Sequence, residues 1–71
     1  MTRSNFGAWV LSQRHDASPV GRLARRCVDD GLLSWHSPDQ LRREMSLAGV
    51  APDDRMWAWL EEAIARWEGI A

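Results

Sequence analysis

Apolar side chains recur along the chain every three or four residues, and no segment alternates apolar and polar residues as a strand does. The clearest case follows Ser18-Pro19, where a capping hydroxyl precedes a proline at the first helical position. Gly31 fits the left-handed residue that terminates many helices. The pattern predicts a helix over residues 19–30. Its apolar stripe consists of Val20, Leu23, Ala24, Cys27 and Val28.

The same reasoning predicts three further helices, over residues 5–14, 38–48 and 52–68. The helix at 38–48 opens on Ser37-Pro38-Asp39-Gln40, a capping box in which the Ser and Gln side chains satisfy two backbone donors. Gly49 marks its end. The last helix has the longest apolar face, formed by Met56, Trp57, Leu60, Ala63, Ile64 and Trp67, with Trp59 to one side.

Five tryptophans supply much of the apolar surface that a small domain needs. Three lie on apolar faces and are expected in the core: Trp9, Trp57 and Trp67. Trp35 falls in the short apolar stretch 32–36 and is expected to anchor that loop. Trp59 lies off the main stripe and is the candidate protein interface, because Trp is enriched at binding hot spots. The alternative is that Trp59 packs on the loop carrying Trp35.

A chain of 71 residues and 8.1 kDa has room for one domain, which we place at 1–71, and is too short for most enzyme scaffolds. The only cysteine, Cys27, excludes an intramolecular disulfide and a cysteine-based zinc site. The apolar runs are too short for a signal sequence or a membrane span. We therefore expect a cytoplasmic protein that does not enter the membrane.

The near-neutral net charge of -1 conceals an uneven distribution. All nine basic residues are arginines. Residues 1–26 hold five of them and one acid, for a local charge of +4, whereas residues 27–71 hold four arginines and nine acids, for -5. This asymmetry indicates either a basic face that meets an acidic one inside the bundle or a surface for a charged partner.

Nucleic-acid binding is one function that the arginines allow. The helix at 19–30 carries arginines at positions i, i+3 and i+4, which form one cationic ridge. Against this function, the connection 31–37 is longer than the turn of a helix-turn-helix. The alternative is that the ridge is a solvated face whose arginines pair with acids such as Asp29 and Asp30. The candidate contacts to nucleic acid or another anionic partner are Arg14, Arg22, Arg25, Arg26, Arg42 and Arg43.

His15 and His36 are the candidates for chemistry, since serines and acids lie near each in the sequence. A Ser-His-Asp site needs an oriented base, an oxyanion hole and a pocket, and four short helices leave little room for one. Ser18 and Ser37 already have a role as helix caps. The spacing of the two histidines is not typical of metal ligands, and Cys27 lies on an apolar face. We expect no catalysis, no cofactor and no metal.

The sequence resembles a known bacterial family at both ends. The succession Phe6-x-x-Trp9-Val10, followed by Ser18-Pro19-Val20-Gly21-Arg22-Leu23-Ala24, is similar to the opening of the YozE-like family of small SAM-like helical proteins. Residues 60–68 look like the closing helix of that family. Arg22 departs from the pattern, which commonly has an acid there, and Leu33-Ser34-Trp35-His36 replaces an aromatic-proline pair. The resemblance implies a compact SAM-like bundle and supplies no catalytic residue.

These observations predict an all-α protein, a compact four-helix SAM-like bundle. The expected function is that of a non-catalytic interaction module, whose partner is another protein or a second copy of the chain. The alternative is a nucleic-acid-associated protein that uses the arginine ridge.

Overall fold

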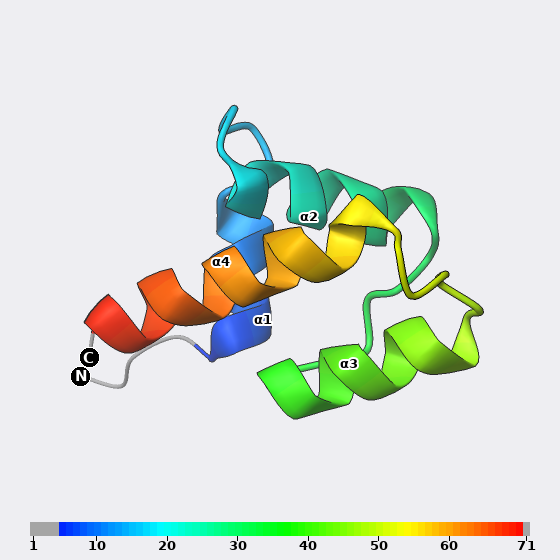
Figure 1. Cartoon of the computed structure of the whole chain (residues 1–71). Coiled ribbons are helices and arrows are strands. Elements are labelled where there is room, and N and C mark those ends of the chain that lie inside the picture. The colour runs from blue at the N-terminus through cyan, green and yellow to red at the C-terminus, as the bar shows by residue number, and fades with distance from the viewer. Residues whose placement is uncertain (1–4, 71) are drawn as a thin grey trace.

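Residues 5–70 form a compact bundle of four helices in the computed structural model, which describes this range and the side chains of residues 5–69. The helices are α1 (Phe6–Ser12), α2 (Pro19–Asp29), α3 (Pro38–Leu47) and α4 (Arg55–Ile70). α2 packs against both α4 and α1, while α3 lies at the opposite end of the molecule from α2 (Figure 1). The range contains no strand, and the predicted all-α four-helix bundle is confirmed.

Both predicted serine caps begin their helices. The hydroxyl oxygen of Ser18 accepts the backbone N–H of Gly21 at the start of α2, and that of Ser37 accepts the N–H of Gln40 at the start of α3. The Gln40 side chain reaches back as a capping box requires, but its oxygen accepts the N–H of His36 rather than that of Ser37. Each cap satisfies a donor that the helix itself leaves unpaired.

The two predicted glycine stops are also confirmed. Gly31 and Gly49 have φ angles of 73° and 80°, in the left-handed region that glycine adopts without steric cost. The residue after each glycine donates to a carbonyl oxygen in the last helical turn, from Leu32 to Cys27 at 2.8 Å and from Val50 to Met45 at 3.0 Å. This Schellman arrangement turns an apolar side chain back toward the core after each helix.

Three helix boundaries differ from the prediction by two residues or more, and one of them is the end of α4, which lies at Ile70 rather than 68. α1 ends at Ser12, two residues early, because Gln13 and Arg14 donate to carbonyls only three residues back and tighten the chain into a turn. α4 begins at Arg55 rather than 52, because its cap is Asp54, whose carboxylate accepts the Met56 N–H at 2.9 Å.

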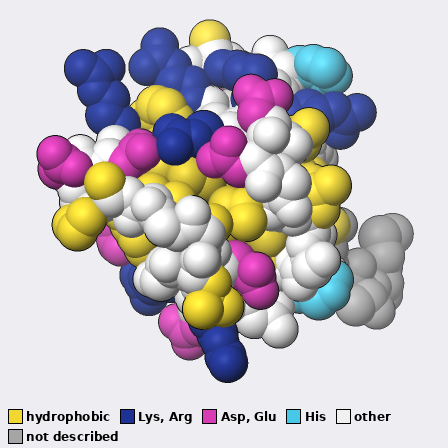
Figure 2. Space-filling view, turned by 90° about the vertical axis from the view of Figure 1, so that its right-hand side faces the viewer, with side chains coloured by type: hydrophobic (Ala, Val, Ile, Leu, Met, Phe, Trp, Pro, Cys, Tyr) yellow, Lys and Arg dark blue, Asp and Glu magenta, His cyan; other side chains and the backbone are white. Residues whose placement is uncertain are grey.

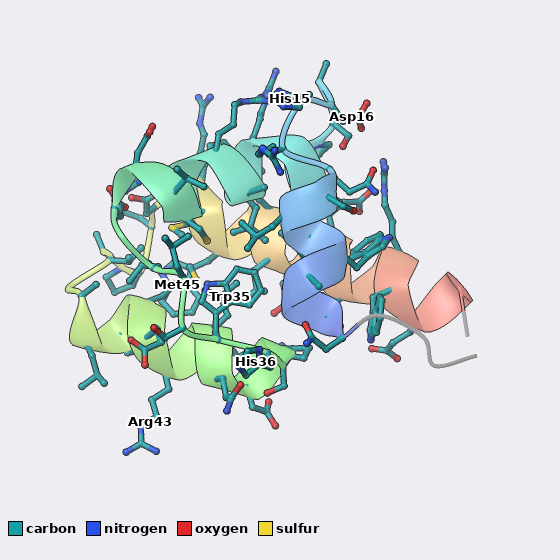
Figure 3. The ribbon with its side chains drawn as sticks, turned by 180° about the vertical axis from the view of Figure 1, so that it is seen from behind. His15, Asp16, Trp35, His36, Arg43 and Met45 are labelled. Carbon is teal, nitrogen blue, oxygen red and sulfur yellow. The ribbon has the colours of Figure 1, made fainter. Side chains whose placement is uncertain are left out.

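The core is continuous across all four helices and centres on Trp35, which is 2% exposed. Its indole N–H donates to the carbonyl of Leu32, so the buried ring leaves no unpaired donor. Figure 3 shows Trp35 between the helices, beside Met45. The predicted loop anchor is therefore the central aromatic side chain of the fold. Around it are Phe6, Val10, Val20, Leu23, Ala24, Cys27, Leu32, Leu41, Met45, Met56, Leu60 and Ala63.

The prediction of three core tryptophans is wrong. Trp9, Trp57 and Trp67 are half-buried and pack against the core from outside, as Trp59 does. Phe6 joins two of them to Trp35, with ring centroids 5.8 to 6.2 Å from its own. Exposure therefore does not distinguish Trp59 from the other three.

Candidate functional site

The turn at residues 13–18 is held against α2 by close backbone contact. A Cβ atom at Gly21 would overlap the carbonyl oxygen of Asp16 and lie 2.8 Å from that of Gln13. The guanidinium of Arg25 donates from one nitrogen to two carbonyl oxygens of the same turn, those of Arg14 and Asp16, each at 2.8 Å. The turn therefore has a fixed position relative to α2.

This arrangement places four basic side chains at one end of the molecule, and we call Arg14, His15, Arg22 and Arg25 the basic end. Arginine side chains gather along the upper edge in Figure 2, which is the end where the turn stands above α2 in Figure 1. None of these three arginines forms an ion pair with a carboxylate among residues 5–69. Their charge is available to a partner.

A hollow of about 190 Å³ opens beside the basic end. Arg14, His15, Arg25, Val28 and Asp29 line it. Val28 belongs to the predicted α2 stripe but is 46% exposed, whereas the neighbouring Cys27 is buried, so Val28 lies at the edge of that stripe. The hollow thus combines two arginines, a carboxylate and an aliphatic surface.

Arg26 does not belong to the basic end. Its guanidinium contacts Asp30 at 2.9 Å and Asp54 at 2.9 and 3.2 Å. Hydrogen bonds to Asp54 and Asp30 raise the pKa of Arg26, and the Arg26 bond together with the Met56 N–H lowers the pKa of Asp54. The cationic ridge predicted on α2 is therefore interrupted. Its expected pairing with acids is confirmed for Asp30 and not for Asp29.

The arginines of α3 are also separate from the basic end. Arg42 pairs with Asp39 at 3.4 Å and with Glu61 of α4 at 3.0 Å. Arg43 points into solvent at the opposite end of the molecule from His15 (Figure 3). The six candidate arginines thus do not form one surface, because only Arg14, Arg22 and Arg25 lie together without acidic partners.

The residues weighed for chemistry are far apart or already engaged. His15 and His36 lie at opposite ends of the molecule (Figure 3), and the Ser18 and Ser37 hydroxyls cap helices. Burial raises the pKa of the Cys27 thiol to about 12, so the reactive thiolate does not form at neutral pH. No group of three or more potential metal ligands occurs in the described part of the chain.

Comparison with protein families, curated proteins and solved structures finds no match to this chain. The resemblance to the YozE-like family therefore stays a prediction. Of the helices described between residues 5 and 70, none has the length and apolar character needed to cross a membrane.

Proposed function

We propose that this protein is a non-catalytic interaction module whose basic end binds an acidic surface of a partner protein. The supporting observation is that Arg14, Arg22 and Arg25 stand together without a carboxylate partner among residues 5–69. Arginine presents several N–H donors in a planar fork that matches a carboxylate. An unpaired cluster of this kind favours an anionic partner and increases its association rate.

The acids near the basic end favour a protein over a nucleic acid. Asp29 lines the hollow beside Arg14 and Arg25, and the backbone carbonyl of Asp16 accepts from Arg25. The carboxyl of Asp16, whose pKa hydrogen bonding to Ser18 lowers from 3.8, is ionised at neutral pH. A nucleic-acid backbone has negative charge at every phosphate, so these carboxylates would oppose its approach. A protein surface has charges of both signs and can avoid them.

Binding of a fluorescein-labelled peptide of repeated Glu-Ser-Ser, in which uncharged residues separate the acids, tests this proposal when it is followed by anisotropy at low salt. We expect Arg22→Glu to weaken binding about tenfold, because it reverses one charge of the surface. Arg43→Glu is the matched control, since this arginine is also exposed but lies on α3, at the other end of the molecule, and its replacement should have little effect. Equal losses in both variants would reveal nothing more than a response to net charge and contradict the proposed surface.

Nucleic-acid binding is tested in the same titrations with random-sequence duplex and single-stranded DNA. If DNA binds with a steep salt dependence that Arg22→Glu reduces, and the Glu-Ser-Ser peptide does not bind, the nucleic-acid alternative replaces the proposal. If neither probe binds, the basic end is a solvated face.

A second copy of the chain is one source of the acidic surface, because residues 27–71 have a net charge of -5. Analytical ultracentrifugation over a range of protein concentrations tests whether the chain associates with itself. Association that weakens with salt and with Arg22→Glu indicates head-to-tail contact between copies, and a monomer under all conditions excludes a second copy as the partner.

A further inference from the structure

Val28 is an unusual member of the apolar stripe on α2. The preceding stripe residues Val20, Leu23, Ala24 and Cys27 are buried, whereas Val28 is 46% exposed. A single exposed valine is ordinary on a protein surface. This one lines a concave hollow whose other walls are Arg14, His15, Arg25 and Asp29, so its methyl groups lie within reach of the charged groups that would hold a partner.

The shape of the hollow is set by contacts that exist without a ligand. Gly21 lets the turn at 13–18 approach α2, and Arg25 joins the carbonyls of Arg14 and Asp16 to the helix. A partner entering the hollow would not have to order this turn. Preformed sites avoid the entropic cost that mobile loops add to binding.

The size and chemistry of the hollow restrict what it accepts. Its volume of about 190 Å³ is smaller than the roughly 300–1,000 Å³ of sites for small molecules and cofactors, and suits a single side chain. Val28 offers that side chain an aliphatic contact. Arg14 and Arg25 offer donors to carboxylates on either side of it, and Asp29 disfavours a carboxylate inside the hollow itself.

We infer that the hollow is a specificity pocket for a large aliphatic side chain, so that the partner is an acidic segment with a leucine-like residue among its carboxylates. This inference rests on the proposed function and adds to it the residue that selects the partner. The methyl groups of Val28 contact the aliphatic side chain of the partner, while the arginines of the basic end bind the acids beside it.

The test compares two fluorescein-labelled peptides, one of repeated Glu-Glu-Leu and a matched one in which every Leu is Ser. We expect the wild-type protein to bind the leucine peptide about fivefold more tightly, the ratio for one partly buried aliphatic side chain. Val28→Ala should reduce this preference below about twofold and leave the affinity for the serine peptide unchanged. Leu47→Ala is the matched control, because Leu47 is 74% exposed on α3, and should keep the full preference.

Both substitutions introduce alanine, the best helix former, at exposed helical positions, so the variants should fold. Equal binding of the two peptides to the wild type, or a preference that survives Val28→Ala, would overturn the pocket and leave the proposed function intact. If neither peptide binds the wild-type protein, the proposed function fails as well. A preference lost equally in Val28→Ala and Leu47→Ala would also overturn the assignment to this hollow.

Discussion

Arg26 on α2 holds both carboxylate oxygens of Asp54, at 3.2 and 2.9 Å, while one of these oxygens also caps α4 through the N–H of Met56. One acidic side chain thus both starts the longest helix and connects it to α2. A second carboxylate, that of Asp30, holds the same guanidinium in place from its own helix. The two helices with the most extensive contact are tied together at the point where α2 ends and α4 begins.

Replacing Asp54 should therefore destabilise the fold in two distinguishable steps. Asp54→Asn keeps an oxygen for the Met56 N–H and weakens only the ion pair, whereas Asp54→Ala removes both. We expect the melting temperature to fall in the order wild type, Asp54→Asn, Asp54→Ala, measured by circular dichroism. Asp53→Ala, at the exposed neighbouring position, serves as the control and should melt close to the wild type. Identical melting of the Asn and Ala variants would contradict the capping role.

Acid should destabilise the protein by protonating Asp54. Its hydrogen bond with Arg26, and then that with the Met56 N–H, lower the pKa of Asp54 below the ordinary value of 3.8. The unfolded chain therefore binds this proton at a higher pH than the folded protein. The stabilisation by Asp54 is complete above the pKa that its carboxyl has in the unfolded chain. It is lost as pH falls through the lower pKa of the same carboxyl in the folded protein.

Urea unfolding at a series of pH values below about 5 measures this loss. Asp54→Asn should show a shallower decline than the wild type. Part of the decline should remain, because the pKa of Asp16 is also lowered, chiefly by its hydrogen bond with Ser18. A decline of unchanged slope in Asp54→Asn would contradict the pKa assignment.

Gly21→Ala should destabilise the protein although alanine is the better helix former. The added Cβ would overlap the Asp16 carbonyl oxygen, and separating the turn from α2 should cost about 1–3 kcal/mol, more than the gain in helix propensity. Gly69→Ala is the matched control, since among the described residues no atom outside its own stretch of helix lies within 4 Å of the position its Cβ would take. It should be neutral or stabilising by up to about 1 kcal/mol. Urea denaturation compares the two, and equal effects would show that Gly21 has no steric role.

Cys27 should react with thiol reagents only when the protein unfolds. Burial raises its pKa from the ordinary 9.0 to about 12, so the thiol is protonated and shielded in the folded state. Disulfide-exchange reagents at mildly alkaline pH should modify it slowly in buffer and rapidly in denaturant. Rapid modification of the folded protein would show that the thiol is accessible.

The same shift predicts a loss of stability at high pH. As pH rises, Cys27 loses its thiol proton in the unfolded chain before it does so in the folded protein. Its contribution to the free energy of unfolding is therefore complete below pH 9.0 and declines as pH rises toward about 12. Cys27→Ala should lack this part of the pH dependence in denaturant titrations.

The sequence predicted the features that depend on neighbouring residues. Ser18, Ser37, Gly31 and Gly49 begin or end helices through bonds within a few residues, so their roles could be read locally. The start of α4 was misplaced because the choice of Asp54 as cap involves Arg26, which is distant in the sequence.

The candidate site was predicted only in part for a related reason. Helical spacing correctly placed Arg22 and Arg25 on one side of α2, but tertiary partners draw the side chains of Arg25 and Arg26 in different directions. The hollow was not foreseen, because it brings Val28 to a turn that precedes its helix. Gly21, a glycine inside an otherwise regular helical pattern, was the available signal of that close approach.

Trp35 has a further consequence for engineering this chain. The segment that joins α2 to α3 forms no helix, but it contributes Trp35, the largest buried side chain among the described residues. A sequence inserted in this segment would displace the Trp35 ring from the core, even if the insert were entirely polar. Residues 51–53 lie within the connection between α3 and α4, are exposed throughout, and offer the position for an affinity tag or a fluorescent reporter.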